Sequence, residues 1–173
     1  ESYELTDGTK IKAVWGLGGH NLLPYKVHGH KLVLCVPNGV MKGVRMNDNE
    51  IYALETFATT GSGKVKQLPV ETWNHFMINE KTRIDKKMLK DPLVNWAMDK
   101  EFGNCGLPFT QIQCQDICDP KQLQKSFDNN MSRQIIVPFP PLADKKGSMS
   151  SQFEHTIFVT EHGVEVFSLS DDY

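Results

Sequence analysis

The chain has 173 residues, with 19 Lys and Arg against 21 Asp and Glu, so its formal net charge is −2. A charge this small excludes a broad electrostatic field for DNA or an anionic membrane as the main partner. No apolar run approaches the roughly 18 residues of a membrane-spanning helix, and the first residues do not have the pattern of a signal peptide. We therefore predict a soluble, cytoplasmic protein without a DNA or membrane partner.

Residues 2–14 predict a hairpin that turns at Asp7-Gly8, and residues 31–36 predict a further strand that ends in a turn at residues 37–39. Between them, Gly16-Leu17-Gly18-Gly19 predicts a turn in which backbones can approach closely. We reject a phosphate-binding loop, because no Gly-Lys-Ser/Thr follows and Pro24 prevents a helix from starting there.

Three histidines, His20, His28 and His30, fall within eleven residues after this turn. Imidazole is a common metal ligand, so the cluster could bind a metal ion. The alternative is that these histidines are ordinary polar residues that line a turn, and the local pattern leaves both interpretations open.

Two mostly apolar strands each carry one central glutamate. Residues 51–60 carry Glu55 on the side of Ile51, Ala53 and Phe57, and residues 151–159 carry Glu154. Both faces of the second strand are largely apolar, which predicts a strand covered on both sides. A carboxylate inside a protein needs a cation, strong hydrogen-bond donors or a proton, so we ask what pairs with Glu154.

The middle of the chain, from about residue 70 to residue 138, has a different sequence pattern from the segments on either side. Residues 72–77 predict irregular structure, and residues 85–102 predict a helix, whose start could instead be Pro92. A shorter helix is expected at residues 120–127 with Asp119 as its N-cap. Residues 135–142 predict a proline-stiffened extended connector, and residues 161–163 a turn into a last strand at 164–168.

The chain has four cysteines, at positions 35, 105, 114 and 118. Only Cys114 and Cys118 are close in sequence, and their spacing does not match a structural zinc site. We expect free thiols in a reducing compartment.

One histidine and two glutamates make an incomplete oxygen and nitrogen ligand set for a divalent cation. A nucleophile triad fits less well, because no serine or cysteine lies in an elbow-like context. A glycosidase could use two carboxylates but would not require the histidine. A two-metal site needs bridging carboxylates and more ligands than His20, Glu55 and Glu154 supply.

These residues belong to a longer series of motifs that resembles the type 2 methionine aminopeptidases over the whole chain. In chain order the motifs are Gly19-His20, Tyr25-Lys26-Val27-His28, Tyr52-Ala53-Leu54-Glu55-Thr56-Phe57, Thr60-Gly61-Ser62-Gly63, Pro138-Phe139-Pro140-Pro141-Leu142, Gly147-Ser148, Gln152-Phe153-Glu154-His155-Thr156-Ile157 and Asp171-Asp172-Tyr173. The match is specific in the strands and loose in the stretch between them.

The resemblance implies an α+β pita-bread fold, of which this chain would be one half of a pseudo-symmetric domain. Residues 1–69 would form core strands, residues 70–138 a mainly helical insertion, and residues 139–173 a C-terminal core hairpin. Glu55 and Glu154 are 99 positions apart, which argues against prolidase-like relatives, in which the two glutamates are closer.

The resemblance also implies a site. In the family two aspartates, one histidine and two glutamates hold two metal ions; His20, Glu55 and Glu154 match the last three, and Glu154 matches the bridging ligand. Glu55 would also pass a proton to and from the attacking water. His28 would contact substrate near the metals, and Phe139 and His75 would line the methionine pocket.

The implied function is that of a dinuclear metal-dependent aminopeptidase that removes the initiator methionine from nascent chains. Its two metals would be Co, Mn, Zn or Fe, and it could associate with the ribosome. The two aspartates would come from an N-terminal half outside this sequence. The isolated chain is therefore expected to be inactive. The alternative is a non-catalytic pita-bread protein that binds RNA or proteins; His20, Glu55 and Glu154 and the acidic end of the chain favour the enzyme.

Overall fold

The structure, a computed structural model, describes residues 2–101 and 103–171. Phe102, the predicted end of a helix, and Asp172-Tyr173 of the last motif lie outside the described residues. The chain forms two compact units, one of Glu1–Lys66 with Leu142–Tyr173 and one of Gln67–Pro141. No helix in the described ranges is long and apolar enough to cross a membrane.

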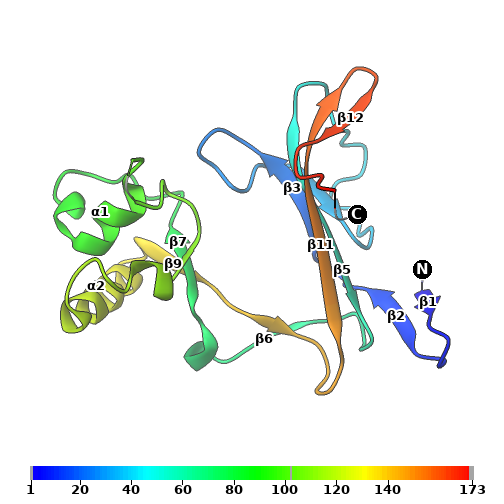
Figure 1. The fold of residues 1–173 in the computed structure, drawn as a ribbon, viewed down its shortest axis with the longest axis horizontal. Coiled ribbons are helices and arrows are strands. Elements are labelled where there is room, and N and C mark those ends of the chain that lie inside the picture. Colours follow the sequence, from blue (N-terminus) through cyan, green and yellow to red (C-terminus); the bar gives the residue numbers. More distant parts are fainter. Residues whose placement is uncertain (1, 102, 172–173) are drawn as a thin grey trace. The chain divides into compact units, whose positions relative to one another are not determined.

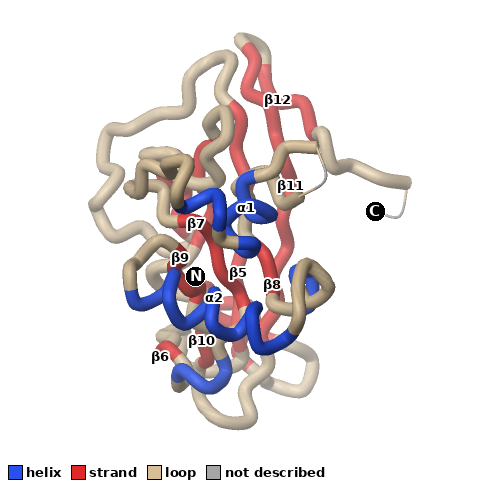
Figure 2. The backbone as a smooth tube through the Cα atoms, turned by 90° about the vertical axis from the view of Figure 1, so that its left-hand side faces the viewer, coloured by secondary structure: helices blue, strands red, loops and turns tan. Residues whose placement is uncertain are grey.

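The first unit is built on a seven-stranded sheet whose pairings are all antiparallel (Figures 1 and 2). Its strands are β1 (Ser2–Glu4), β2 (Lys10–Ala13), β3 (Gly18–Leu22), β4 (Leu32–Leu34), β5 (Ile51–Thr59), β11 (Ser150–Thr160) and β12 (Gly163–Val166). The main path is β1-β2-β5-β11-β12, and β3 pairs with both β4 and β5. The strand β5 is thus the centre of the sheet.

The strand β5 has a different neighbour arrangement on each edge. The strand β11 follows one edge along its whole length, from Thr59 opposite Ser150 to Ile51 opposite Phe158. The other edge is shared: β3 pairs near the start of β5 and β2 near its end. Between them the Cys35 thiol donates to the Glu55 carbonyl oxygen at 3.7 Å and accepts from the Phe57 amide at 3.3 Å, so the backbone of β5 stays hydrogen-bonded across the gap.

The second unit combines helices with a three-stranded sheet in the order β8-β7-β9. Its elements are η1 (Val70–Thr72), β7 (His75–Ile78), η2 (Met88–Lys90), α1 (Pro92–Met98), β8 (Phe109–Thr110), η3 (Ile112–Cys114), α2 (Pro120–Ser132) and β9 (Ile136–Phe139). A separate pair of short strands, β6 (Lys66–Gln67) and β10 (Leu142–Ala143), lies at the two points where the chain passes between the units.

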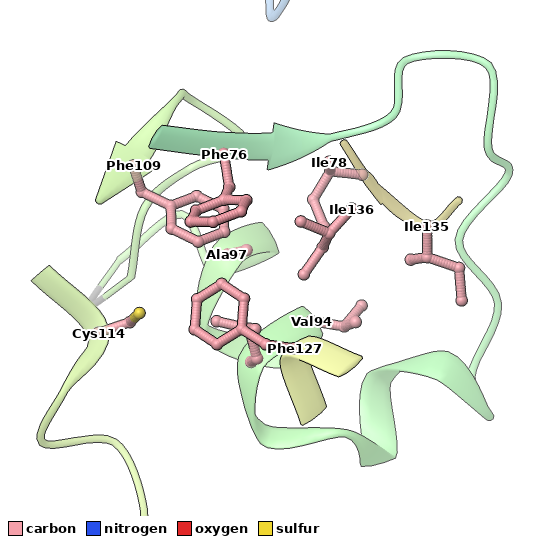
Figure 3. Close-up of a cluster of buried hydrophobic side chains, with 10 residues drawn as sticks. Phe76, Ile78, Val94, Ala97, Phe109, Cys114, Phe127, Ile135 and Ile136 are labelled. Carbon is pink, nitrogen blue, oxygen red and sulfur yellow. The ribbon is translucent and has the colours of Figure 1, made fainter. Parts of the chain in front are cut away.

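An aromatic cluster forms the core of the second unit (Figure 3). The Phe76 ring lies 5.0 Å from the Phe127 ring and 6.3 Å from the Phe109 ring, while Leu93 and Val94 of α1 are fully buried beside them. Such a cluster stabilises through both burial of apolar area and ring contacts. The unit therefore has a core of its own.

Aspartate caps decide where both helices begin. The Asp91 carboxylate accepts from the amides of Leu93 and Val94, and the Asp119 carboxylate accepts from those of Lys121 and Gln122. In each case proline follows the cap, which suits the first helical position because proline has no amide hydrogen to satisfy. The predicted Asp119 cap and the alternative start at Pro92 are confirmed.

Four local predictions need correction. The first helix covers Pro92–Met98 only, and the second extends to Ser132. Residues 75–77, expected to be irregular, form β7 together with Ile78, because they pair with β9, a distant segment that local pattern cannot reveal. Gly18 and Gly19 lie within β3 rather than in a turn. The four cysteines are unbridged, as predicted.

Candidate metal centre

Glu55 and Glu154 stand directly opposite each other on the paired strands β5 and β11. Side chains at opposed positions of an antiparallel pair lie on the same face, with Cβ atoms about 4.5–5.5 Å apart. Glu55 is largely covered, with 15% of its side chain exposed, whereas Glu154 is exposed. The expectation that Glu154 is buried is therefore wrong for this chain: the first half of β11 is open, and Phe153 beside it is 66% exposed.

His20 joins Glu55 from the neighbouring strand β3. It pairs with Ala53, two positions before Glu55, so His20 and Glu55 share a face. The His20 Nε2 atom lies 3.5 Å from Glu55 Oε1, and the side chain of His20 is 8% exposed. The sheet thus brings together the three residues that the resemblance matched to metal ligands.

The His20 ring points its Nε2 atom toward the Glu55 carboxylate and its Nδ1 atom toward a backbone carbonyl oxygen. The Nδ1 atom lies 3.3 Å from the Asn21 carbonyl oxygen, which can only accept, so a proton on Nδ1 would donate to this oxygen. A histidine whose other nitrogen donates to a carbonyl is the usual arrangement in metal sites.

Gly19 allows this close approach of β3 to β5. A Cβ atom at position 19 would lie 2.2 Å from the Ala53 carbonyl oxygen and 2.8 Å from the Glu55 amide nitrogen, both of them backbone atoms. A side chain at position 19 would therefore force the two strands apart and carry His20 away from Glu55.

His28 reaches the same place from the loop after β3. Its ring centroid lies 4.3 Å from that of His20, with the ring planes at 44°. Asn21, a residue that the sequence reasoning missed, holds this loop: its buried side-chain oxygen accepts from the Lys31 amide at 2.8 Å, and its backbone oxygen accepts from Gly29 at 2.7 Å. The one available signal was its position next to His20.

Gln152 is the second residue that the sequence reasoning missed. Its side-chain Nε2 donates to Glu55 Oε2 at 3.0 Å and to Glu154 Oε2 at 3.4 Å. The signal was its place two positions before Glu154, which puts both side chains on the same face of a strand.

The pKa of Glu55 is raised above its usual value, mainly by burial and next by repulsion from Glu154. His20 and the hydrogen bond from Gln152 act in the opposite direction, since both favour the ionised form. The site thus holds a carboxylate whose charge is costly without a cation.

The donor set fits a divalent transition metal in part. Two ligands of one tetrahedral ion, each about 2.0–2.2 Å from the metal, are about 3.4 Å apart, and the separation of His20 Nε2 from Glu55 Oε1 is 3.5 Å. Among the described residues, however, no group of three or more His, Cys, Asp and Glu side chains is arranged to hold a metal ion. The chain therefore offers a pair of fitted donors with Glu154 beside them, and not a complete coordination sphere.

Phe139 and His75 belong to the second unit. They stand opposite each other on β9 and β7, and the His75 Nδ1 atom contacts the Asn74 side-chain oxygen at 2.6 Å. The structure thus brings these two residues together with each other, and their place in a methionine pocket stays a prediction.

An apolar cavity of about 320 Å³ lies in the first unit beside β4. Leu32, Leu34 and Met41 are among its lining residues, and Leu32 stands directly opposite His20 in the β3–β4 pair. An apolar side chain could therefore be bound one strand away from the candidate metal ligand.

A polar cluster fixes the loop before β5. Glu50 contacts the Lys31 ammonium, accepts from the Asn47 amide at 2.8 Å and accepts from the Tyr52 hydroxyl at 2.8 Å. These donors, with Lys31 first, lower the pKa of Glu50 to about 2. The buried Tyr52 ring connects this cluster to β5, which carries Glu55.

Replacement of Glu50 by glutamine is expected to lower the free energy of unfolding by about 1–2 kcal/mol at pH 7. Because the folded-state pKa is depressed, this stabilisation is present above the unfolded value of 4.5 and is lost as the pH falls through about 2. Urea denaturation from pH 7 to pH 2 measures it, with Glu165→Gln on β12 as control. A difference that did not shrink in acid would contradict this account.

Comparison with known structures identifies the class of protein. A thermophilic Arx1 matches 94% of this chain and 42% of its own length with a TM-score of 0.73, at 16% sequence identity. At that identity the likeness establishes the fold alone. The chain is an α+β protein with the pita-bread fold, as predicted.

Sequence comparison narrows the class of protein to one family within this fold. No family model matches the chain. Along its whole length it is 34% identical to methionine aminopeptidase 2-1 of Fusarium vanettenii and 35% identical to methionine aminopeptidase 2 of Schizosaccharomyces pombe. The chain spans 38% and 40% of these two relatives. The resemblance is confirmed: this pita-bread chain is related over its whole length to the type 2 methionine aminopeptidases.

Proposed function

We propose that this chain supplies three of the five ligands of a dinuclear metal site in an aminopeptidase that removes the N-terminal methionine from nascent proteins. One observation carries the proposal: the His20 Nε2 atom faces Glu55 at 3.5 Å, with Glu154 directly opposite Glu55 on the same face of one sheet. Identity of about one third with methionine aminopeptidases along the whole of this chain supports the reaction class.

In this proposal His20, Glu55 and Glu154 hold the cations together with two aspartates from outside residues 1–173. The identity of the metals is open among Co, Mn, Zn and Fe, all of which accept imidazole and carboxylate ligands. When bound, such ions supply a hydroxide at neutral pH and polarise a carbonyl group.

The remaining roles fall to side chains of this chain. Glu55, whose pKa is raised by burial and by repulsion from Glu154, would accept and return a proton. His28, whose ring centroid lies 4.3 Å from that of His20 with the ring planes tilted by 44°, would contact the substrate amide. The apolar cavity beside β4, or a pocket that includes Phe139 and His75, would receive apolar parts of the substrate.

Further parts of the proposal come from the resemblance. The unit of Gln67–Pro141 would be the insertion expected at residues 70–138. The substrate would be the N-terminus of a nascent chain, with a cytoplasmic location and a ribosome partner. Because the chain spans about two fifths of its relatives, turnover belongs to the whole protein.

The test is hydrolysis of a Met-Ala-Ser peptide by the full-length protein with Co²⁺ or Mn²⁺. We expect methionine release that a chelator abolishes and added metal restores. The isolated 173-residue chain should bind metal weakly and release no methionine, because three ligands cannot fill two coordination spheres. Turnover that survives exhaustive chelation, or turnover by the isolated chain, would refute the assignment.

A metal-loaded full-length protein without any turnover would instead favour the alternative, a non-catalytic pita-bread protein that binds RNA or other proteins.

A further inference from the structure

We propose that Gln152 is a positioning residue that holds Glu55 and Glu154 together as one binding pair for a cation. This inference rests on the proposed function, which makes the two carboxylates ligands, but it assigns a role to a residue that is not itself a ligand.

The contact geometry carries the inference. The Nε2 atom of Gln152 donates to one oxygen of each carboxylate, at 3.0 Å to Glu55 and at 3.4 Å to Glu154. A primary amide has two N–H groups on one nitrogen, so it can serve two acceptors at once. The Oε2 atom of Glu55 is thereby turned toward Gln152, while its Oε1 atom faces His20.

The backbone places Gln152 where such a bridge can form. On β11 the side chains alternate, so Gln152 and Glu154 share the face that carries the site, and Phe153 lies on the other face. Gln152 stands opposite Phe57 and Glu154 stands opposite Glu55, so the amide is a diagonal neighbour of Glu55. Diagonal cross-strand neighbours lie within reach of long side chains.

The amide is also the right chemical group. Two ionised carboxylates on facing positions repel each other, and their repulsion contributes to the raised pKa of Glu55. A lysine or arginine in place of Gln152 would relieve that repulsion by neutralising the pair, and would then compete with a metal cation. A neutral donor orders the carboxylates and keeps their negative charge available.

The bridge orders a flexible ligand side chain before a metal ion binds. A glutamate side chain has several rotamers, and ordering it on metal binding costs conformational entropy. The contact with Gln152 fixes Glu154 near Glu55 beforehand. Residues that orient metal ligands in this way typically change metal affinity about 10–100-fold when replaced.

The test compares two glutamine-to-methionine variants of the full-length protein. Gln152→Met keeps the length of the side chain but removes the donor. Gln124→Met is the matched control, because the Gln124 amide also donates to a carboxylate, that of Asp128 at 2.9 Å, on the exposed surface of α2. Isothermal titration with Co²⁺ and the visible absorption of the bound Co²⁺ provide readouts independent of turnover.

We expect Gln152→Met to weaken Co²⁺ binding about 10-fold or more and to change the Co²⁺ spectrum, with a thermal midpoint close to that of the unchanged protein. Gln124→Met should change Co²⁺ affinity less than about 2-fold, since it touches no ligand. Equal affinity in Gln152→Met and the unchanged protein would overturn the inference.

A second measurement separates this inference from the proposed function. If the unchanged protein binds no Co²⁺, the proposed function fails, and metal-free crystal structures then decide about Gln152. A Glu154 side chain that turns away from Glu55 in Gln152→Met, but not in Gln124→Met, supports the positioning role. An unmoved Glu154 overturns it.

Discussion

Alanine at position 154 is expected to abolish metal retention and methionine release in the full-length protein. The substitution removes the carboxylate that stands opposite Glu55 and matches the bridging ligand, so the remaining donors cannot hold two cations. We expect turnover to fall by more than about 100-fold, beyond the effect of losing a residue that only orients a ligand. Metal content of the purified variant and peptide hydrolysis measure the two effects.

Glu165→Ala is the control for this substitution, since Glu165 is an exposed glutamate on the adjacent strand β12. It should keep both metal and activity. Because Glu154 is exposed in this chain, its loss should leave the fold of this chain intact. Loss of activity in Glu154→Ala would therefore report the missing ligand and not an unfolded protein. Full activity of Glu154→Ala would refute the site.

Alanine at position 19 should disrupt the site from the backbone side. The added Cβ atom would lie 2.2 Å from the Ala53 carbonyl oxygen, so β3 and β5 must separate. We expect a loss of about 1–3 kcal/mol or more in the free energy of unfolding, typical of overpacking, together with weaker metal binding as His20 moves from Glu55. Thermal unfolding and Co²⁺ titration measure both.

Gly8→Ala separates the clash from the general cost of replacing a glycine. Gly8 has a φ of +79°, and a Cβ atom there would meet no other atom within 4 Å. The variant should be destabilised by about 1 kcal/mol through backbone strain alone, without loss of metal affinity. Equal metal affinity in Gly19→Ala and Gly8→Ala would show that Gly19 does not hold His20 in place.

The strands that carry the two glutamates could be predicted from the sequence, because residues 51–59 and 151–159 are mostly apolar runs that end at turn residues. The pairing itself could not. Nothing in the local pattern says that Glu154 stands opposite Glu55 and not one position away, a shift that would put the two carboxylates on opposite faces. The pairing of His20 with Ala53 is equally long-range.

Three differences have identifiable physical causes. Glu154 is exposed because no other described segment of this chain covers the first half of β11, although the apolar residues on both faces of the strand predicted such a cover. The strand β7 forms because β9 offers it a partner from a distant part of the chain. Asn21 and Gln152 escaped notice because a single amide side chain has no periodicity, and its role appears only when its acceptors are placed in space.

The most direct test of the central claim is a crystal structure of the full-length protein grown with Mn²⁺, with anomalous scattering recorded for the metal. The account predicts two anomalous peaks about 3.5–4 Å apart, with His20 Nε2 and the carboxylates of Glu55 and Glu154 among their ligands. Absence of any peak beside these three side chains at saturating Mn²⁺ would contradict it.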